Sequence, residues 1–83
     1  MESNQLSLNP VNSKTISGIA FEDGIMYVQF SSGVMYKYFD ISFPEYSSIL
    51  EDISPGSKLR RIVSEKLYEK LSAEDKDFKR IKK

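Results

Sequence analysis

Three short runs of β-favouring residues, separated by turns, occupy the first half of the chain. They are 15–21 (TISGIAF), 25–31 (IMYVQFS) and 34–39 (VMYKYF). Each run is rich in Ile, Val, Tyr or Phe, which pack well on a pleated surface. The connections have hairpin length, and loops this short cannot make a parallel crossover. The pattern therefore predicts a three-stranded antiparallel meander.

The loop at 31–33 (SSG) decides which face of this sheet carries Tyr36 and Tyr38. A three-residue loop with its glycine in the left-handed region places both tyrosines on the face of Met26, Val28 and Phe30. A two-residue turn shifts the register and moves them to the other face. We expect the three-residue loop, because it keeps one apolar face uninterrupted. The rings are then part of the core wall, with their hydroxyls reaching its edge.

The opposite face of the predicted sheet is too apolar for a solvated surface. In this register it carries Tyr27, Gln29, Met35, Lys37 and Phe39. Exposed apolar patches mark partner surfaces, and self-association would stabilise so small a chain. We therefore expect a homo-oligomer of two-fold symmetry, with Tyr27, Met35 and Phe39 in its interface.

An amphipathic helix is predicted directly after the strands. Ser42 followed three residues later by Glu45 fits a capping box, and Pro44 stands in the first turn, where a missing N–H costs little. The apolar positions then recur on one helical face, at Tyr46, Ile49, Leu50 and Ile53.

The segment SPGS (54–57) ends this helix and opens a second one. Its apolar stripe comprises Leu59, Ile62, Val63, Leu67 and Leu71. Residues 72–83 follow as a third short helix or a basic tail, and residues 1–12 precede the strands as a flexible arm. The prediction is one α+β domain over 13–71, in the order β-β-β-α-α, with the helices packed on one face of the sheet.

The amino-acid composition limits the catalytic and metal-binding chemistry that the chain can perform. The chain has 83 residues, no cysteine and no histidine. The usual general base at neutral pH and the thiol nucleophile are therefore absent, and no thiolate zinc site can form. No apolar run approaches the ~18 residues of a membrane span. We expect a cytoplasmic protein without catalytic residues, metal or cofactor, located in a bacterial host cell if the chain is viral.

Charge is distributed unevenly along the chain. Residues 1–56 contain seven acidic and two basic side chains, whereas residues 57–83 contain ten basic and five acidic ones. The first part therefore has a net charge of −5 and the second of +5, although the whole is neutral. This asymmetry suggests that the C-terminal part meets an anion, although solvated helix faces would also explain it.

The start of the second predicted helix is the strongest candidate site. A glycine-bearing turn that opens a helix leaves backbone N–H groups free, and the helix dipole favours negative charge there. Basic residues in the first turns are unfavourable, because they lie near the positive end of that dipole. An anionic ligand would explain their presence. The alternative is that a serine caps the helix while the bases pair with nearby acids. The candidate phosphate-binding residues are Ser54, Gly56, Ser57, Lys58, Arg60 and Arg61, with Tyr36 and Tyr38 as second-rank contacts.

A set of spaced residues runs through the middle of the chain: Phe30-x-x-Gly33-x-x-Tyr36-x-Tyr38, Phe39-x-Ile41, Tyr46-x-x-Ile49-Leu50 and Ser54-x-Gly56. This set resembles the KTSC family over roughly 12–68. The family comprises small domains at the end of some lysyl-tRNA synthetases and stand-alone bacterial and viral proteins, and the resemblance implies RNA binding. The family's Ile-Arg pair corresponds here to Val63 and Ser64, so arginines stand one turn earlier, at Arg60 and Arg61.

The leading functional hypothesis is a non-catalytic nucleotide-binding protein. A two-fold interface would match a cyclic dinucleotide, and a viral protein of this kind would act as a sponge for a host immune signal. The alternatives are an RNA-binding module, which the acidic first half disfavours, and a protein-interaction module that uses the outer sheet face. A carboxylate-based hydrolase is least favoured, because no acid/base pair is evident.

Overall fold

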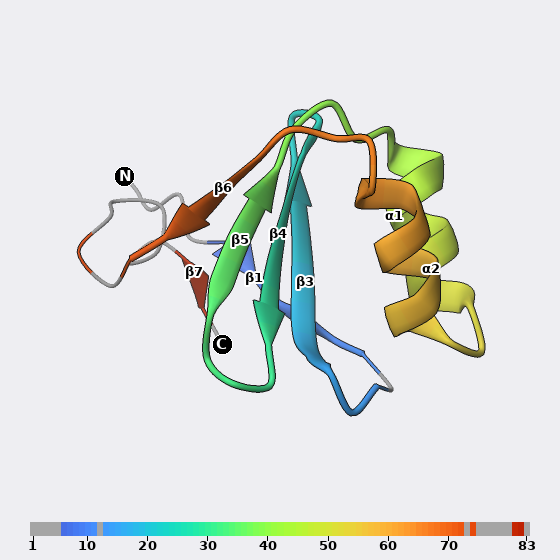
Figure 1. Cartoon of the computed structure of the whole chain (residues 1–83), viewed down its shortest axis with the longest axis horizontal. Helices are drawn as coiled ribbons and strands as arrows, with labels where there is room; N and C mark the ends of the chain where they lie inside the picture. Colours follow the sequence, from blue (N-terminus) through green and yellow to red (C-terminus); the bar gives the residue numbers. More distant parts are fainter. Residues whose placement is uncertain (1–5, 12, 73, 75–80, 83) are drawn as a thin grey trace.

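A five-stranded antiparallel sheet with two helices on one face forms the framework of the protein (Figure 1). The structure is a computed structural model and describes residues 6–11, 13–72, 74 and 81–82. The sheet order is β2 (Asn9–Pro10), β3 (Ile16–Glu22), β4 (Ile25–Phe30), β5 (Met35–Tyr38) and β6 (Tyr68–Leu71). The helices α1 (Phe43–Glu51) and α2 (Pro55–Val63) connect β5 to β6. A separate parallel pair joins β1 (Leu6–Ser7) to β7 (Ile81–Lys82).

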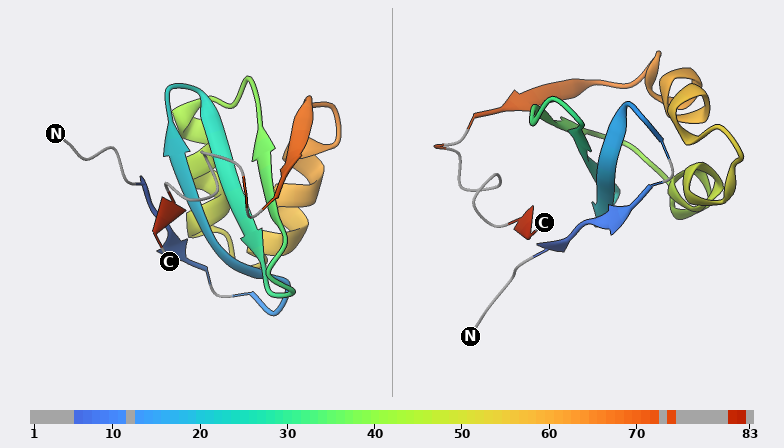
Figure 2. Two further views of the ribbon diagram at one scale, coloured as in Figure 1. Left: turned by 90° about the vertical axis from the view of Figure 1, so that its left-hand side faces the viewer. Right: turned by 90° about the horizontal axis from the view of Figure 1, so that it is seen from below.

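The α+β class and the central meander agree with the prediction from the sequence. β3, β4 and β5 pair antiparallel in chain order, and both helices lie on one side of the sheet (Figure 2). The sheet is larger than predicted, because one further strand is added at each edge. At the first edge, Asn9–Pro10 pairs with β3 inside the segment expected to be a flexible arm.

The second helix is shorter than the sequence predicts. α2 ends at Val63, and Tyr68–Leu71 forms β6, which pairs with β5. The apolar stripe was ambiguous, since Leu67 and Leu71 are four residues apart and a separation of four suits both a helical face and one face of a strand. Leu67 is 78% exposed in the turn between the two elements. The expected third helix within 72–83 lies largely outside the described residues.

The second hairpin has the register expected of a three-residue loop. Val28 pairs with Tyr36 and Met26 with Tyr38. The Phe30 N–H donates to the Val34 carbonyl over 2.8 Å, and Gly33 has a positive φ of 98°. This geometry places both tyrosines on the face that the helices cover, as predicted.

The helix-facing core contains the apolar residues of the sheet together with one side of each helix. Its buried members are Ile16, Ile19, Met26, Val28, Tyr38, Ile41, Tyr46, Ile49 and Leu59. Tyr46 and Ile49 of α1 belong to the predicted apolar stripe, but Ile53 lies beyond the end of the helix and is 95% exposed. The helix-facing core therefore takes one residue fewer from that stripe than predicted.

The outer face of the sheet is covered by the chain itself, which corrects the expectation of an exposed patch. Tyr27 is 2% exposed and Met35 is 1% exposed, in a second cluster with Ala20 and Leu71. Leu6 and Leu8 pack against this cluster. Phe39 is only partly buried. The interface prediction for Tyr27, Met35 and Phe39 assumed an open face, and this assumption is wrong for the first two.

The start of α1 is capped as predicted. The Ser42 N–H donates to Glu45 Oε1 at 2.9 Å, and the Glu45 N–H donates to Ser42 Oγ at 3.3 Å. The bond from the Ser42 backbone lowers the pKa of Glu45; partial desolvation opposes this shift, and the charge of Lys66 adds to it. Lys66 Nζ lies 3.5 Å from Glu45 Oε1 and also donates to the Asp40 carbonyl. These contacts join the start of α1 to the turn after α2.

We expect Gly33→Ala to lower the free energy of unfolding by about 1–2 kcal/mol, the cost of a left-handed conformation for a residue with a Cβ. No atom lies within 4 Å of a Cβ built at Gly33, so the cost is conformational and not steric. Urea unfolding measures the change, with exposed Ser32→Ala as the control, expected within ~0.5 kcal/mol of the parent. Equal stability of the Gly33→Ala protein would contradict the three-residue loop.

The capping box also predicts a pH dependence of stability. Because the pKa of Glu45 is lowered on folding, its contribution is complete above the unfolded-state pKa and is lost as the pH falls through the folded-state pKa. The Glu45→Gln protein should therefore lose less thermal stability than the parent between pH 6 and pH 3. Thermal unfolding across this pH range measures the difference. Parallel pH profiles for the two proteins would show that the carboxylate has no such role.

Candidate functional site

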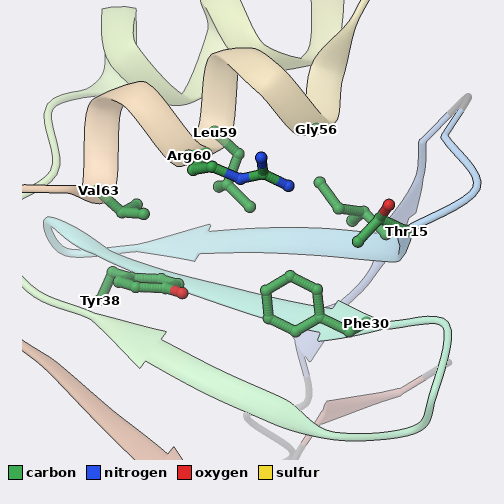
Figure 3. Close-up of a pocket in the computed structure, with 8 residues that line it drawn as sticks. Thr15, Phe30, Tyr38, Gly56, Leu59, Arg60 and Val63 are labelled. Carbon is green, nitrogen blue, oxygen red and sulfur yellow. The ribbon is translucent and has the colours of Figure 1, made fainter.

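Two adjoining cavities lie beside α2, one between the helix and the sheet (Figure 3) and one between the start of the helix and the turn before β3. One has a volume of about 230 Å³ and is lined mainly by apolar side chains: Ile16, Phe30, Tyr38, Leu59 and Val63. The other has a volume of about 280 Å³ and is lined mainly by polar groups at the start of α2. Thr15, Gly56 and Arg60 line both cavities, so the two adjoin.

The apolar cavity has aromatic rings on its sheet side. Phe30 and Tyr38 project from the sheet, and the Arg60 side chain extends from α2 with its guanidinium toward Thr15 (Figure 3). An apolar cavity with two rings and a planar cation suits a flat ring system, because aromatic and guanidinium faces both stack on such rings. The lining of this cavity therefore offers stacking faces to a flat ring system.

Tyr38 connects the apolar cavity to a row of aromatic rings. Its ring centroid lies 6.1 Å from that of Tyr36, and the Tyr36 centroid lies 5.5 Å from that of Tyr68 in β6. Burial raises the pKa of Tyr38, and the neighbouring Tyr36 and Tyr68 add to this shift. The Tyr38 hydroxyl therefore stays protonated at neutral pH and can donate a hydrogen bond. Tyr68 is 62% exposed at the far end of the row.

The polar cavity is formed by the start of α2 and the turn before β3. Its hydroxyl groups belong to Ser13, Thr15, Ser54 and Ser57. Ser54 is the N-cap residue, but its side chain makes no capping bond. The first intrahelical bond runs from the Lys58 N–H to the Ser54 carbonyl, so the N–H groups of Gly56 and Ser57 donate to no described residue. Free donors of this kind attract anions.

Gly56 lets the start of α2 approach the turn before β3. A Cβ at this position would lie 3.3 Å from Ser13 Oγ. That oxygen already accepts bonds from the backbone N–H groups of Thr15 and Ile16, at 3.1 and 3.3 Å. The Ser13 hydroxyl proton is thus free to be donated toward the cavity. Gly56 therefore contributes to the site through its backbone and its small size.

The three basic residues of α2 do not lie at one common site. Arg60 lines both cavities, whereas Lys58 and Arg61 line neither. α2 has nine residues, so Arg60 and Arg61 lie in its last turn, where the dipole favours cations. This corrects the expectation that they oppose the dipole from the first turns. Among the described residues, no carboxylate forms an ion pair with Arg60.

The structure therefore brings together most of the candidates from the sequence and adds Ser13, Thr15 and Phe30 to the residues with usable side chains. Ser54, Gly56, Ser57, Arg60 and Tyr38 line the cavities, and Tyr36 contacts the Tyr38 ring. Phe30 could have been found from the sequence, since the three-residue loop places it on the face of Tyr36; the ring centroids of Phe30 and Tyr36 are 5.6 Å apart. No sequence signal pointed to Ser13 or Thr15.

In the described part of the chain, no group of three or more acidic residues is placed to hold a metal ion. None of the described helices has the length and apolar character needed to cross a membrane. No protein-family model matches the chain, and no curated protein matches it significantly. The resemblance to the KTSC family thus stays a prediction from the sequence.

Proposed function

We propose that this protein is a non-catalytic nucleotide-binding protein whose ligand occupies the two adjoining cavities beside α2. The observation that carries the proposal is the position of Arg60, which lines both an aromatic apolar cavity and a polar cavity at a helix start. A nucleotide has the matching arrangement, with a flat base joined through a sugar to an anionic phosphate.

The phosphate lies in the polar cavity. It accepts bonds from the N–H groups of Gly56 and Ser57 and from the serine hydroxyls, and the guanidinium of Arg60 adds a charged donor. The base lies in the apolar cavity between the rings of Phe30 and Tyr38 and the side chain of Leu59. Aromatic contacts of this kind contribute about 1–3 kcal/mol per base.

Cyclic dinucleotides are the class that we favour, with stoichiometric sequestration of a signalling nucleotide as the role. A chain without histidine or cysteine lacks the usual catalytic groups, which supports binding without turnover. An apolar oligomer interface on the outer sheet face gives the proposal no support, because the chain's own residues cover Tyr27 and Met35. One chain contains both cavities, so the proposal does not depend on an oligomer.

We expect Arg60→Ala to weaken nucleotide binding by about 10- to 100-fold, the loss of one charged hydrogen-bonding partner. The measurement is calorimetric titration with a panel of cyclic dinucleotides. Arg61→Ala is the matched control, since it removes the same charge from the next position but lines neither cavity. It should change the affinity by less than about threefold, through long-range charge alone. Equal losses in the two variants, or no binding of any nucleotide by the parent, would refute the proposal.

Salt dependence distinguishes this site from an RNA-binding surface. Each phosphate contacted by a basic residue contributes about 0.7 to the slope of log K against log salt for single strands. Because Arg60 is the one cation among the described residues that line the cavities, we expect a slope below about 1. A short single-stranded RNA bound with a slope of about 3 or more would instead favour the RNA-binding alternative, with contacts outside the cavities.

A further inference from the structure

The charge around the polar cavity is small. Among the described residues that line the two cavities, Arg60 is the only charged one. The start of α2 adds roughly half a positive charge from its aligned peptide dipoles. A ligand group that enters the polar cavity therefore meets about one and a half positive charges at most.

A carboxylate reduces this charge further. The Ser54 N–H donates to Asp52 Oδ1 at 2.8 Å, which fixes the carboxylate two residues before the N-cap of α2. Its negative charge opposes both Arg60 and the helix dipole. Within the described structure, no basic side chain forms an ion pair with Asp52. The net charge that faces a ligand at the helix start is therefore well below two.

The remaining donors at the cavity are neutral. The hydroxyl of Ser54 is not used as a helix cap, and Ser13 Oγ accepts two backbone bonds and keeps its own proton for donation. Thr15 and Ser57 add two further hydroxyls. Such groups form hydrogen bonds to phosphate oxygens without adding positive charge. They favour an anion whose charge is already low.

From this balance, and resting on the proposed function, we propose that the site selects phosphodiesters over phosphomonoesters and polyphosphates. A phosphodiester carries one negative charge, which Arg60 and the helix start balance. A phosphomonoester carries nearly two at pH 8, because its second pKa is about 6. No further cation among the described lining residues balances the second charge, and the Asp52 carboxylate, held next to the cavity by the Ser54 N–H, repels it. Cyclic and internally linked nucleotides belong to the preferred class, and free mononucleotides do not.

The test compares each 3′,5′-cyclic mononucleotide with the 5′-monophosphate of the same base by calorimetric titration. At pH 8.0 we expect the cyclic form to bind at least tenfold more tightly. At pH 5.5 the monophosphate becomes mostly singly charged, so the preference should fall to less than about threefold. The protein has no histidine or cysteine whose titration would interfere in this interval. A preference that stays constant with pH would overturn the charge argument.

Asp52→Asn tests the carboxylate directly. Asparagine keeps an oxygen that can accept the bond from Ser54 but removes the charge. At pH 8.0 this variant should bind the monophosphates at least threefold more tightly and narrow the preference for the cyclic form. Glu65→Gln is the control, since it removes an exposed carboxylate after the other end of α2 and should leave the preference unchanged. Matching changes in the two variants would show a non-specific effect of net charge.

The outcomes separate the two proposals. If neither class of nucleotide binds at either pH, the proposed function fails. If both classes bind with equal affinity at pH 8.0, or if the monophosphates bind more tightly, the site is a nucleotide site without the proposed selectivity. Unfolding midpoints of both variants within a few degrees of the parent confirm that the comparison is made on folded protein.

Discussion

The register of the hairpin between β4 and β5 is the constraint on which the rest of the structure depends. Its three-residue loop, with Gly33 at positive φ, sets Val28 opposite Tyr36 and Met26 opposite Tyr38. A slip of one residue would move every side chain of β5 to the other face. In this register both faces of the sheet are apolar, so each must be covered. The helices cover one face, and segments from the two sides of the meander cover the other.

The candidate site follows from incomplete coverage of the helix-facing side. α2 packs through Leu59 on the sheet and leaves one cavity against the rings of Phe30 and Tyr38 and another against the turn before β3. The residues that close the core and the residues that line the site are therefore partly the same. A substitution at Leu59 or Tyr38 would alter folding and binding together. A substitution at Arg60 tests binding separately from folding, because Arg60 is exposed and has no described ion-pair partner.

Much of the framework could be predicted because its signals are local. Glycine turns delimit the strands, the loop length sets the hairpin register, and Ser42 with Glu45 marks the start of α1. The remaining features depend on tertiary contacts. Tyr68–Leu71 lies in a strand because β5 offers an open edge, whereas its own spacing suited a helix equally well. Likewise, Thr15 and Ser13 enter the site only because Gly56 lets α2 approach their turn.

The cluster on the outer face has a consequence for how the chain can be made. Tyr27 and Met35 are shielded by Leu6 and Leu8 from one part of the sequence and by Leu71 from another. During synthesis, Leu6 and Leu8 are available from the start, but this cluster is completed only after residue 71 has been added. N-terminal fragments that stop short of Leu71 leave part of this cluster and the edge of β5 uncovered, and they expose an aggregation-prone surface.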